Sequence, residues 1–228
     1  MLAPAVCFLC GTPLAIEDRG LCAGCWSTVV PVPDTRCQRC GRETDTDEAL
    51  CPACTTNPPP QASTTVWGEY DGTLRRAILA LKHHGRDELA GPLGHRLAVR
   101  LASRPWLPSV DAVVPVPSHP VRRVQRGWVA AELLARVVAH DLGRPVRRVL
   151  RRRGLGLQVT RTKAQRQALG AGSFRASRRL AGQTFLLIDD VLTTGATLRR
   201  AAQTLLGAGA GAVHCAVISI ALDPRRLV

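Results

Sequence analysis

The sequence predicts an α/β domain with a mainly parallel sheet, preceded by a small region that holds metal in four-cysteine sites. Eight cysteines lie in C-x-x-C pairs within the first 54 residues, and strand-like and helix-like patterns alternate from about residue 62 onward. The segment Asn57-Pro58-Pro59-Pro60-Gln61 separates the two parts, and its triple proline favours an extended linker. We therefore expect a cysteine-rich region over residues 1–60 and a second domain over residues 61–228.

The composition fits a globular protein with an anionic partner. Of the 228 residues, 46% are hydrophobic, and 31 Lys and Arg against 17 Asp and Glu give a net charge of +14. This charge suggests nucleic acid or a phosphorylated metabolite as a partner, although the arginine bias also fits genome base composition. No apolar stretch reaches the roughly 18–20 residues that span a bilayer, and the first residues lack a positively charged signal segment. We expect a cytoplasmic protein without membrane insertion.

The cysteine pairs have the spacing of zinc ligands. The pairs are separated by 11, 11 and 10 residues, and a glycine follows the second cysteine of the first and third pairs. Two such pairs complete the tetrahedral coordination of one Zn²⁺ ion. Two sequential four-cysteine ribbons are the simplest arrangement, while interleaved pairs and a disulfide scaffold are alternatives. The candidate ligands are Cys7, Cys10, Cys22, Cys25, Cys37, Cys40, Cys51 and Cys54.

We expect this zinc, one or two ions, to be structural. Four thiolates fill every coordination position and leave none for a catalytic water. The region has few large apolar side chains, so it should not fold without metal. Two such centres would lower the net charge from +14 to about +10.

The second domain is expected to begin with a strand and two helices. Residues 64–70 are rich in β-branched and aromatic side chains, which favours a strand, and Asp71-Gly72 provides a turn. Leu74, Ile78 and Leu81 then recur at helical spacing on one face. A second helix is expected over about residues 87–102.

The remaining elements continue the alternation. Residues 111–116 form a short apolar strand that Pro117 ends, and residues 129–141 form an apolar helix with Gly143 just after its end. A strand over 185–188, a helix over 196–206, a reversal at 207–211 and a strand over 212–222 complete the domain. Ligands of parallel sheets bind beyond the carboxyl ends of the strands.

Such a strand end carries the most informative motif. Asp189 and Asp190 follow the apolar strand, and a hydroxyl-rich turn then enters the next helix. A turn that opens a helix presents unpaired N–H groups to phosphate, and Gly195 permits close approach of the backbone. The two carboxylates would repel phosphate but suit the vicinal hydroxyls of a ribose. The candidate phosphate ligands are Thr193, Thr194, Gly195, Ala196 and Thr197.

This string resembles the thirteen-residue motif of type I phosphoribosyltransferases. With the zinc ribbons, nearly the whole chain resembles the ComF/GntX family of competence-associated phosphoribosyltransferase-like proteins. The resemblance implies that Asp189 and Asp190, as the catalytic acids, hold the ribose of phosphoribosyl pyrophosphate, and that the threonine turn cradles its 5-phosphate. Mg²⁺ would be bound mainly by ligand oxygens and water. The resemblance also implies ligand contacts from Lys82. On the pyrophosphate side it implies contacts from Pro117, Ser118, Arg122, Arg123 and Arg126.

Other segments bear on the same site. Val129-Ala130 stand where the family usually has Asn-Gln, and Leu169 stands where it has Asn, so two polar contacts are missing. The arginine-rich residues 147–179 are expected to form a loop over the site, a basic surface for single-stranded DNA, or a solvated face. The histidines at 83, 84 and 95 lack further ligands at metal spacing and fit a surface helix end.

The sequence therefore favours a phosphoribosyltransferase-fold protein that binds phosphoribosyl pyrophosphate with Mg²⁺ and acts in DNA uptake. Single-stranded DNA and a competence helicase are the implied partners. One alternative is an active phosphoribosyltransferase of nucleotide metabolism with an unknown acceptor. Another is a zinc-ribbon module that docks nucleic acid or protein.

Overall fold

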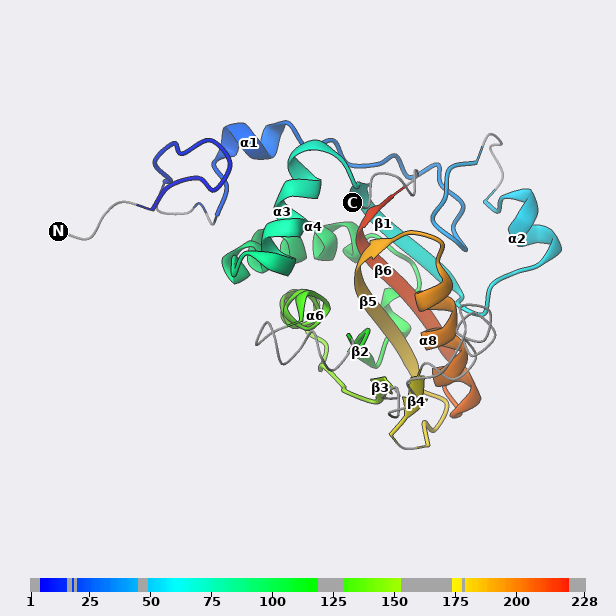
Figure 1. Cartoon of the computed structure of the whole chain (residues 1–228). Coiled ribbons are helices and arrows are strands. Elements are labelled where there is room, and N and C mark those ends of the chain that lie inside the picture. The colour runs from blue at the N-terminus through cyan, green and yellow to red at the C-terminus, as the bar shows by residue number, and fades with distance from the viewer. Residues whose placement is uncertain are drawn as a thin grey trace, which may run out of the picture.

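A four-stranded parallel sheet forms the centre of the molecule (Figure 1). The computed structural model describes residues 5–15, 18, 20–44, 49–118, 129–152, 174–177 and 179–221. The strand order is β1-β6-β5-β2, and each neighbouring pair is parallel. The strands are β1 (Ser63–Glu69), β2 (Ala112–Pro115), β5 (Thr184–Leu192) and β6 (Ala212–Ile220).

Helices cover both faces of this sheet. In Figure 1, α3, α4 and α6 lie on one face and α8 lies on the other. Side chains of β5 alternate accordingly: Leu186 and Ile188 enter the core under the three helices, while Phe185 and Leu187 enter the core under α8. The helices of the described chain are α1 (Ala23–Ser27), α2 (Pro52–Thr56), α3 (Gly72–His83), η1 (Asp87–Leu89), α4 (Ala90–Ala102), η2 (Leu107–Ser109), α6 (Ala130–Asp141) and α8 (Ala196–Gly207).

The predicted α/β fold with a mainly parallel sheet is confirmed, but β5 is longer than the sequence predicts. The apolar pattern predicts a strand over residues 185–188, but β5 continues to Leu192. Its last residues pair with β6 as far as Leu192 and Ile220. Backbone pairing with a long neighbour therefore extends the strand through both acids, which the apolar pattern alone does not indicate.

The arginine-rich segment also differs from the predicted loop. Its two ends form an antiparallel pair of short strands, β3 (Leu150–Arg152) and β4 (Phe174–Ala176). Leu150 and Phe174 are buried in the core under α8. Each strand has only three residues, too few for the sequence to show an alternating pattern. Residues 153–173 lie outside the described residues.

The segment between the two cysteine clusters runs along the outer edge of β1. The Val32 amide donates to the Trp67 carbonyl oxygen at 3.0 Å, and the Thr64 amide donates to the Gln38 carbonyl oxygen at 2.8 Å. This segment partly pairs an edge strand that would otherwise expose its backbone groups. The division at residue 60 remains a prediction, since the cysteine-rich region packs closely against the sheet domain.

The first cysteine cluster packs against α3, η1 and α4. Cys7 and Leu21 are buried in the same core as Leu89 and Leu93. The Arg96 guanidinium lies 3.9 Å from the centre of the Trp26 ring, a distance typical of a cation–π contact.

Among the helices of the described residues, none has the length and apolar character of a membrane span.

Gly209→Ala is expected to destabilise the fold by about 2 kcal/mol or more. Gly209 has a φ of 96°, and an added Cβ would lie 2.5 Å from the Leu180 carbonyl oxygen. Gly207→Ala is the matched control, because nothing lies within 4 Å of its Cβ position. Urea unfolding of the zinc-loaded protein, followed by tryptophan fluorescence, measures both variants. Equal unfolding midpoints for the two would contradict this packing.

Candidate functional site

A cleft of about 460 Å³ opens at the carboxyl ends of the parallel strands. Tyr70 follows β1, Val116–Ser118 follow β2, and Asp189–Val191 end β5. Lys82 and His83 enter from the end of α3, and Arg152 enters from β3. This is the position at which parallel α/β sheets bind ligands.

The two acids reach the cleft from opposite faces of β5. Consecutive strand residues point to opposite faces, and Asp190 lies on the α3 face, where its Oδ1 is 2.7 Å from the Lys82 Nζ. Both partners are largely buried, with 24% of the Lys82 side chain and 16% of the Asp190 side chain exposed. Asp189 lies nearer the face that carries β3, and its Oδ1 accepts a hydrogen bond from the Asp190 amide at 2.9 Å.

The environment keeps one of the two acids partly protonated near neutral pH. Burial raises the pKa of Asp189 to about 7, and the adjacent Asp190 carboxylate adds to this rise. The Asp190 amide, Lys82 and Arg152 oppose it. The acid pair therefore combines an ion-paired carboxylate with a carboxyl that titrates in the physiological range, an arrangement common at ligand sites.

The threonine turn links the cleft to α8. Gly195 is the N-cap residue of α8 and has a φ of 77°, a conformation that favours glycine. The Ala196 amide donates to the Thr194 Oγ1 at 3.3 Å. Thr193 and Thr197 line the cleft, whereas Thr194 and Gly195 line a neighbouring cavity of about 260 Å³ beside the second cysteine cluster.

The structure brings most of the predicted site residues together. Lys82, Pro117, Ser118, Asp189, Asp190, Thr193 and Thr197 line the cleft. Ala196 begins α8 next to Thr197. Arg122, Arg123 and Arg126 lie outside the described residues.

Three polar or charged residues of the cleft lining, Tyr70, His83 and Arg152, were not predicted as site residues. Tyr70 follows a parallel strand, so its position was a usable signal. His83 adjoins Lys82, and Arg152 lies in a segment whose short strand has no clear sequence signature. On the opposite wall, Val129 and Ala130 present apolar side chains where the family pattern has polar ones.

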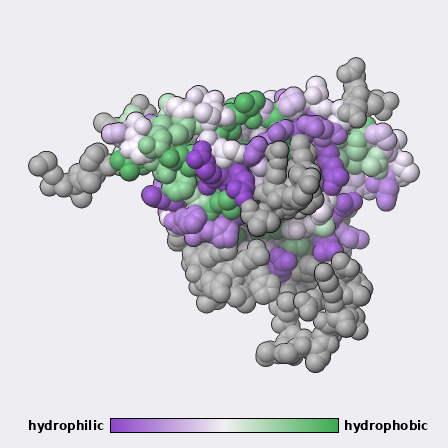
Figure 2. Space-filling model, turned by 45° about the horizontal axis from the view of Figure 1, so that its top comes forward, coloured by the Kyte–Doolittle hydropathy of each residue, from purple (hydrophilic) through white to green (hydrophobic). Residues whose placement is uncertain are grey.

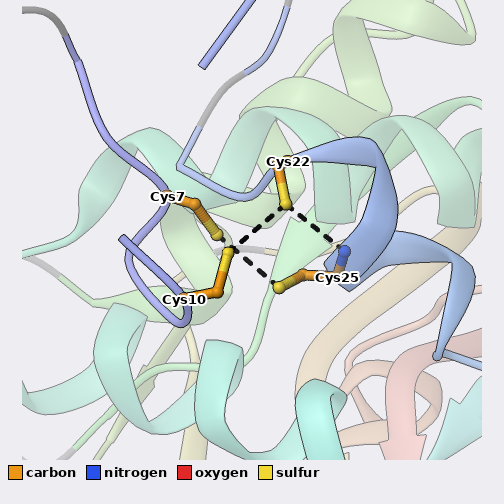
Figure 3. Close-up of side chains that lie close together, drawn as sticks. All are labelled: Cys7, Cys10, Cys22 and Cys25. Carbon is orange, nitrogen blue, oxygen red and sulfur yellow. Dashed lines mark hydrogen bonds between the residues drawn. The ribbon is translucent and has the colours of Figure 1, made fainter. Parts of the chain in front are cut away.

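The eight paired cysteines form two sequential groups of four. Figure 3 shows Cys7, Cys10, Cys22 and Cys25 pointing toward one another, and Cys37, Cys40, Cys51 and Cys54 form the second group. Within each group the four sulfur atoms lie within 4.8 Å of one another. The interleaved alternative is therefore not what the structure has. Cys215, the ninth cysteine, is a buried residue of β6.

Both groups fit tetrahedral zinc. A Zn–S bond of about 2.3 Å gives a tetrahedron whose S–S edges are about 3.8 Å. The Sγ–Sγ distances are 3.7 Å for Cys7 and Cys25, 3.6 Å for Cys10 and Cys22, and 3.8 Å for Cys40 and Cys51. These are structural zinc sites, because each would fill all four positions with thiolate.

The exposed His95 side chain lies at the surface. Among the described residues, only the two cysteine groups bring three or more potential ligands together. The His95 Nδ1 lies 3.0 Å from an Asp141 carboxylate oxygen, which gives this exposed side chain a partner on α6. This arrangement agrees with the expected surface position.

Known families and proteins match nearly the whole chain. The double zinc ribbon domain matches residues 1–55, and the phosphoribosyl transferase domain matches residues 111–225. DNA utilization protein YhgH of Salmonella typhi is 31% identical over 219 residues, which cover 94% of this chain and 96% of that protein. Competence protein F of Haemophilus influenzae is 30% identical over 212 residues, with coverage of 87% and 90%.

Among solved structures, the glutamine phosphoribosylpyrophosphate amidotransferase from B. subtilis matches 61% of this chain and 30% of that chain, with 22% identity and a TM-score of 0.44. The fold and the family matches define a phosphoribosyltransferase-fold protein with an N-terminal double zinc ribbon. The chain belongs to the ComF/GntX family, as its motifs predict.

Asp189→Asn is expected to raise the thermal unfolding midpoint more at pH 8 than at pH 5. The folded-state pKa of Asp189 is raised from 3.8 to about 7, so the folded protein binds more protons than the unfolded chain between these values. The stability that this carboxyl contributes is present below about pH 4 and is lost as the pH rises through about 7. The Asn side chain does not titrate, so the variant does not lose this stability as the pH rises. Scanning calorimetry at both pH values measures the effect.

Asp87→Asn, at an exposed position of η1, is the control and should shift the midpoint equally at the two pH values. The explanation fails if Asp189→Asn also shifts the midpoint by the same amount at pH 5 and pH 8.

Proposed function

We propose that the cleft binds phosphoribosyl pyrophosphate together with Mg²⁺. The observation that carries this proposal is the convergence of the acid pair with Thr193 and Thr197 of the threonine turn on one cleft at the carboxyl end of β5. Vicinal hydroxyls of the ribose would donate to the two carboxyl groups. The N–H groups and hydroxyls at the start of α8 would bind the 5-phosphate.

The pyrophosphate group would lie on the β2 side of the cleft. Ser118 lines this wall, and its Oγ is buried with no hydrogen-bond partner among the described residues. Such a hydroxyl is available to a phosphate oxygen. Arg152 brings a guanidinium from β3, and guanidinium groups suit phosphate oxygens.

Lys82 would serve the apo and the bound states differently. Without ligand its ammonium neutralises Asp190 across 2.7 Å. A bound ligand would bring its own negative charge, and Mg²⁺ would supply a cation that offsets it. Lys82 is then positioned to contact the ligand phosphates from α3.

We favour binding over turnover. Transfer to an acceptor requires polar groups that recognise the acceptor's edge. Val129, Ala130 and Ala131 make one wall of the cleft apolar at the start of α6. This wall offers no side-chain hydrogen bond, although it accommodates the flat face of a sugar or base.

We further propose that the protein acts in DNA uptake or utilisation, with single-stranded DNA and a helicase as partners. Relatives named for DNA utilization and competence support this role. The net charge of +14 favours an anionic partner. Figure 2 shows several hydrophilic patches, drawn in purple, on the face presented there.

Calorimetric titration of the zinc-loaded protein with phosphoribosyl pyrophosphate and Mg²⁺ tests the cleft. We expect micromolar binding that weakens at least about tenfold in Asp189→Asn/Asp190→Asn, because charge-assisted contacts to the ribose are lost. Asp87→Asn should bind like the wild type. Equal affinity of the wild type and the double variant would refute the assignment. Pyrophosphate release with added nucleobases, measured in parallel, would show turnover.

Fluorescence anisotropy with a single-stranded oligonucleotide tests the second part. The affinity should fall steeply between about 50 and 200 mM salt, because phosphate contacts release counterions. If the same cleft takes the strand end, Asp189→Asn also abolishes this binding. No measurable binding at low salt would exclude direct contact with DNA.

A further inference from the structure

A third cavity, of about 200 Å³, lies along the outer edge and the start of β1, away from the cleft. Its walls come from the start of β1, from the segment between the zinc sites and from the end of α4. The cleft instead begins beyond the carboxyl end of β1, a strand of seven residues that spans about 20 Å. Nothing in the proposed function uses this cavity.

Three arginines line the cavity, and each carries a buried nitrogen that has no hydrogen-bond partner among the described residues. Arg36 is 7% exposed, yet its Nε and Nη1 have no hydrogen-bond partner among the described residues. Its Nη2 is held from outside the cavity by Glu43 at 2.9 Å and Glu69 at 3.4 Å. The Nε atoms of Arg100 and Arg104 are likewise buried and unpartnered in the described part of the chain.

Buried donors without partners destabilise a fold by about 1–3 kcal/mol each, and more when they are charged. Native proteins therefore satisfy nearly all such groups, and clustered exceptions require an explanation. Four unpartnered nitrogen atoms on side chains that line one cavity call for a ligand rich in acceptors. The charges of Arg100 and Arg104, opposed there by the exposed Asp34, make that ligand an anion.

The other walls are compatible with an anion. The Trp106 and His214 rings stack at 4.0 Å with an interplanar angle of 7°, and the Ser63 Oγ lies 2.8 Å from the His214 Nδ1. Burial lowers the pKa of His214 to about 4, so this ring is neutral. Cys37 of the second zinc centre also lines the cavity, and its negative charge places the anion on the arginine side.

One carboxylate already occupies part of this anion position. Asp34 pairs through its Oδ1 with the Arg100 Nη2 at 2.9 Å and with the Arg104 Nη2. The Asp34 side chain is 68% exposed, so it is free to swing into solvent when a stronger anion arrives. Among the residues that the structure describes, no other acid lines the cavity.

We propose that this cavity binds a terminal phosphate group, with Arg36, Arg100 and Arg104 as its ligands and Asp34 as an internal competitor. Once Asp34 is displaced, the guanidinium groups of Arg100 and Arg104 match the double negative charge of a phosphate monoester at neutral pH better than the single charge of a carboxylate. Arg36, whose charge Glu43 and Glu69 balance, adds hydrogen-bond donors. The phosphate belongs to a free nucleotide or to the end of a nucleic-acid strand.

Asp34→Asn and Arg36→Gln test the site in opposite directions. Calorimetry with inorganic phosphate, on the zinc-loaded full chain, should show about tenfold tighter binding in Asp34→Asn and about tenfold weaker binding in Arg36→Gln. Neither residue lines the cleft, so binding of phosphate in the cleft would not respond to them. Unchanged phosphate affinity in Asp34→Asn overturns the proposal.

Arg36→Gln removes a buried cation and is judged only if it retains the zinc content of the wild type. If it loses zinc, Arg104→Gln replaces it with the same expectation. Adenosine monophosphate and a 5′-phosphorylated tetranucleotide, each titrated into wild type and Asp34→Asn, then distinguish the two sources. The source is the ligand whose affinity rises more on the substitution, and a rise for neither overturns the proposal.

Discussion

The pairing of β5 between β6 and β2 is the constraint on which the rest of the structure depends. Its first residues are fully buried on both faces, which fixes the strand in the sheet. Its last residues therefore emerge at a fixed place with one acid toward each face. From there the chain turns at Gly195 into α8, so the same backbone path that buries the core also presents the acids and the N–H groups of a helix start to one cleft.

The zinc ribbons pack against the sheet domain. The knuckle around Cys37 and Cys40 lies on β1, and an added Cβ on Gly41 would lie 2.8 Å from Val66 and 3.5 Å from Leu192. Leu192 immediately precedes the threonine turn. Zinc in the second ribbon would thus hold backbone that packs against the end of β5, next to the threonine turn, while the first ribbon packs on α3 and α4. Metal binding and the shape of the cleft are linked through packing.

The sequence predicted those features whose causes are local. Cysteine spacing indicated both zinc sites, periodic apolar residues located the helices, and the string from Asp189 to Thr197 indicated that the acid pair and the threonine turn lie between a strand and a helix. Features set by contacts between distant segments could not be predicted. Examples are the Lys82–Asp190 ion pair, the extension of β5 by pairing with β6, and the cavity that Arg36 and Arg100 both line. The three-residue strand that brings Arg152 to the cleft is too short to carry a pattern.

We propose that the end of β5 and the start of α8 form a single phosphoribosyl site. A crystal structure of the zinc-loaded protein grown with phosphoribosyl pyrophosphate and Mg²⁺ would test this. We expect the 5-phosphate against the turn from Thr193 to Thr197 and the ribose hydroxyls within hydrogen-bond distance of Asp189 and Asp190. A ligand bound elsewhere, with the Lys82–Asp190 pair and the threonine turn untouched, would contradict it.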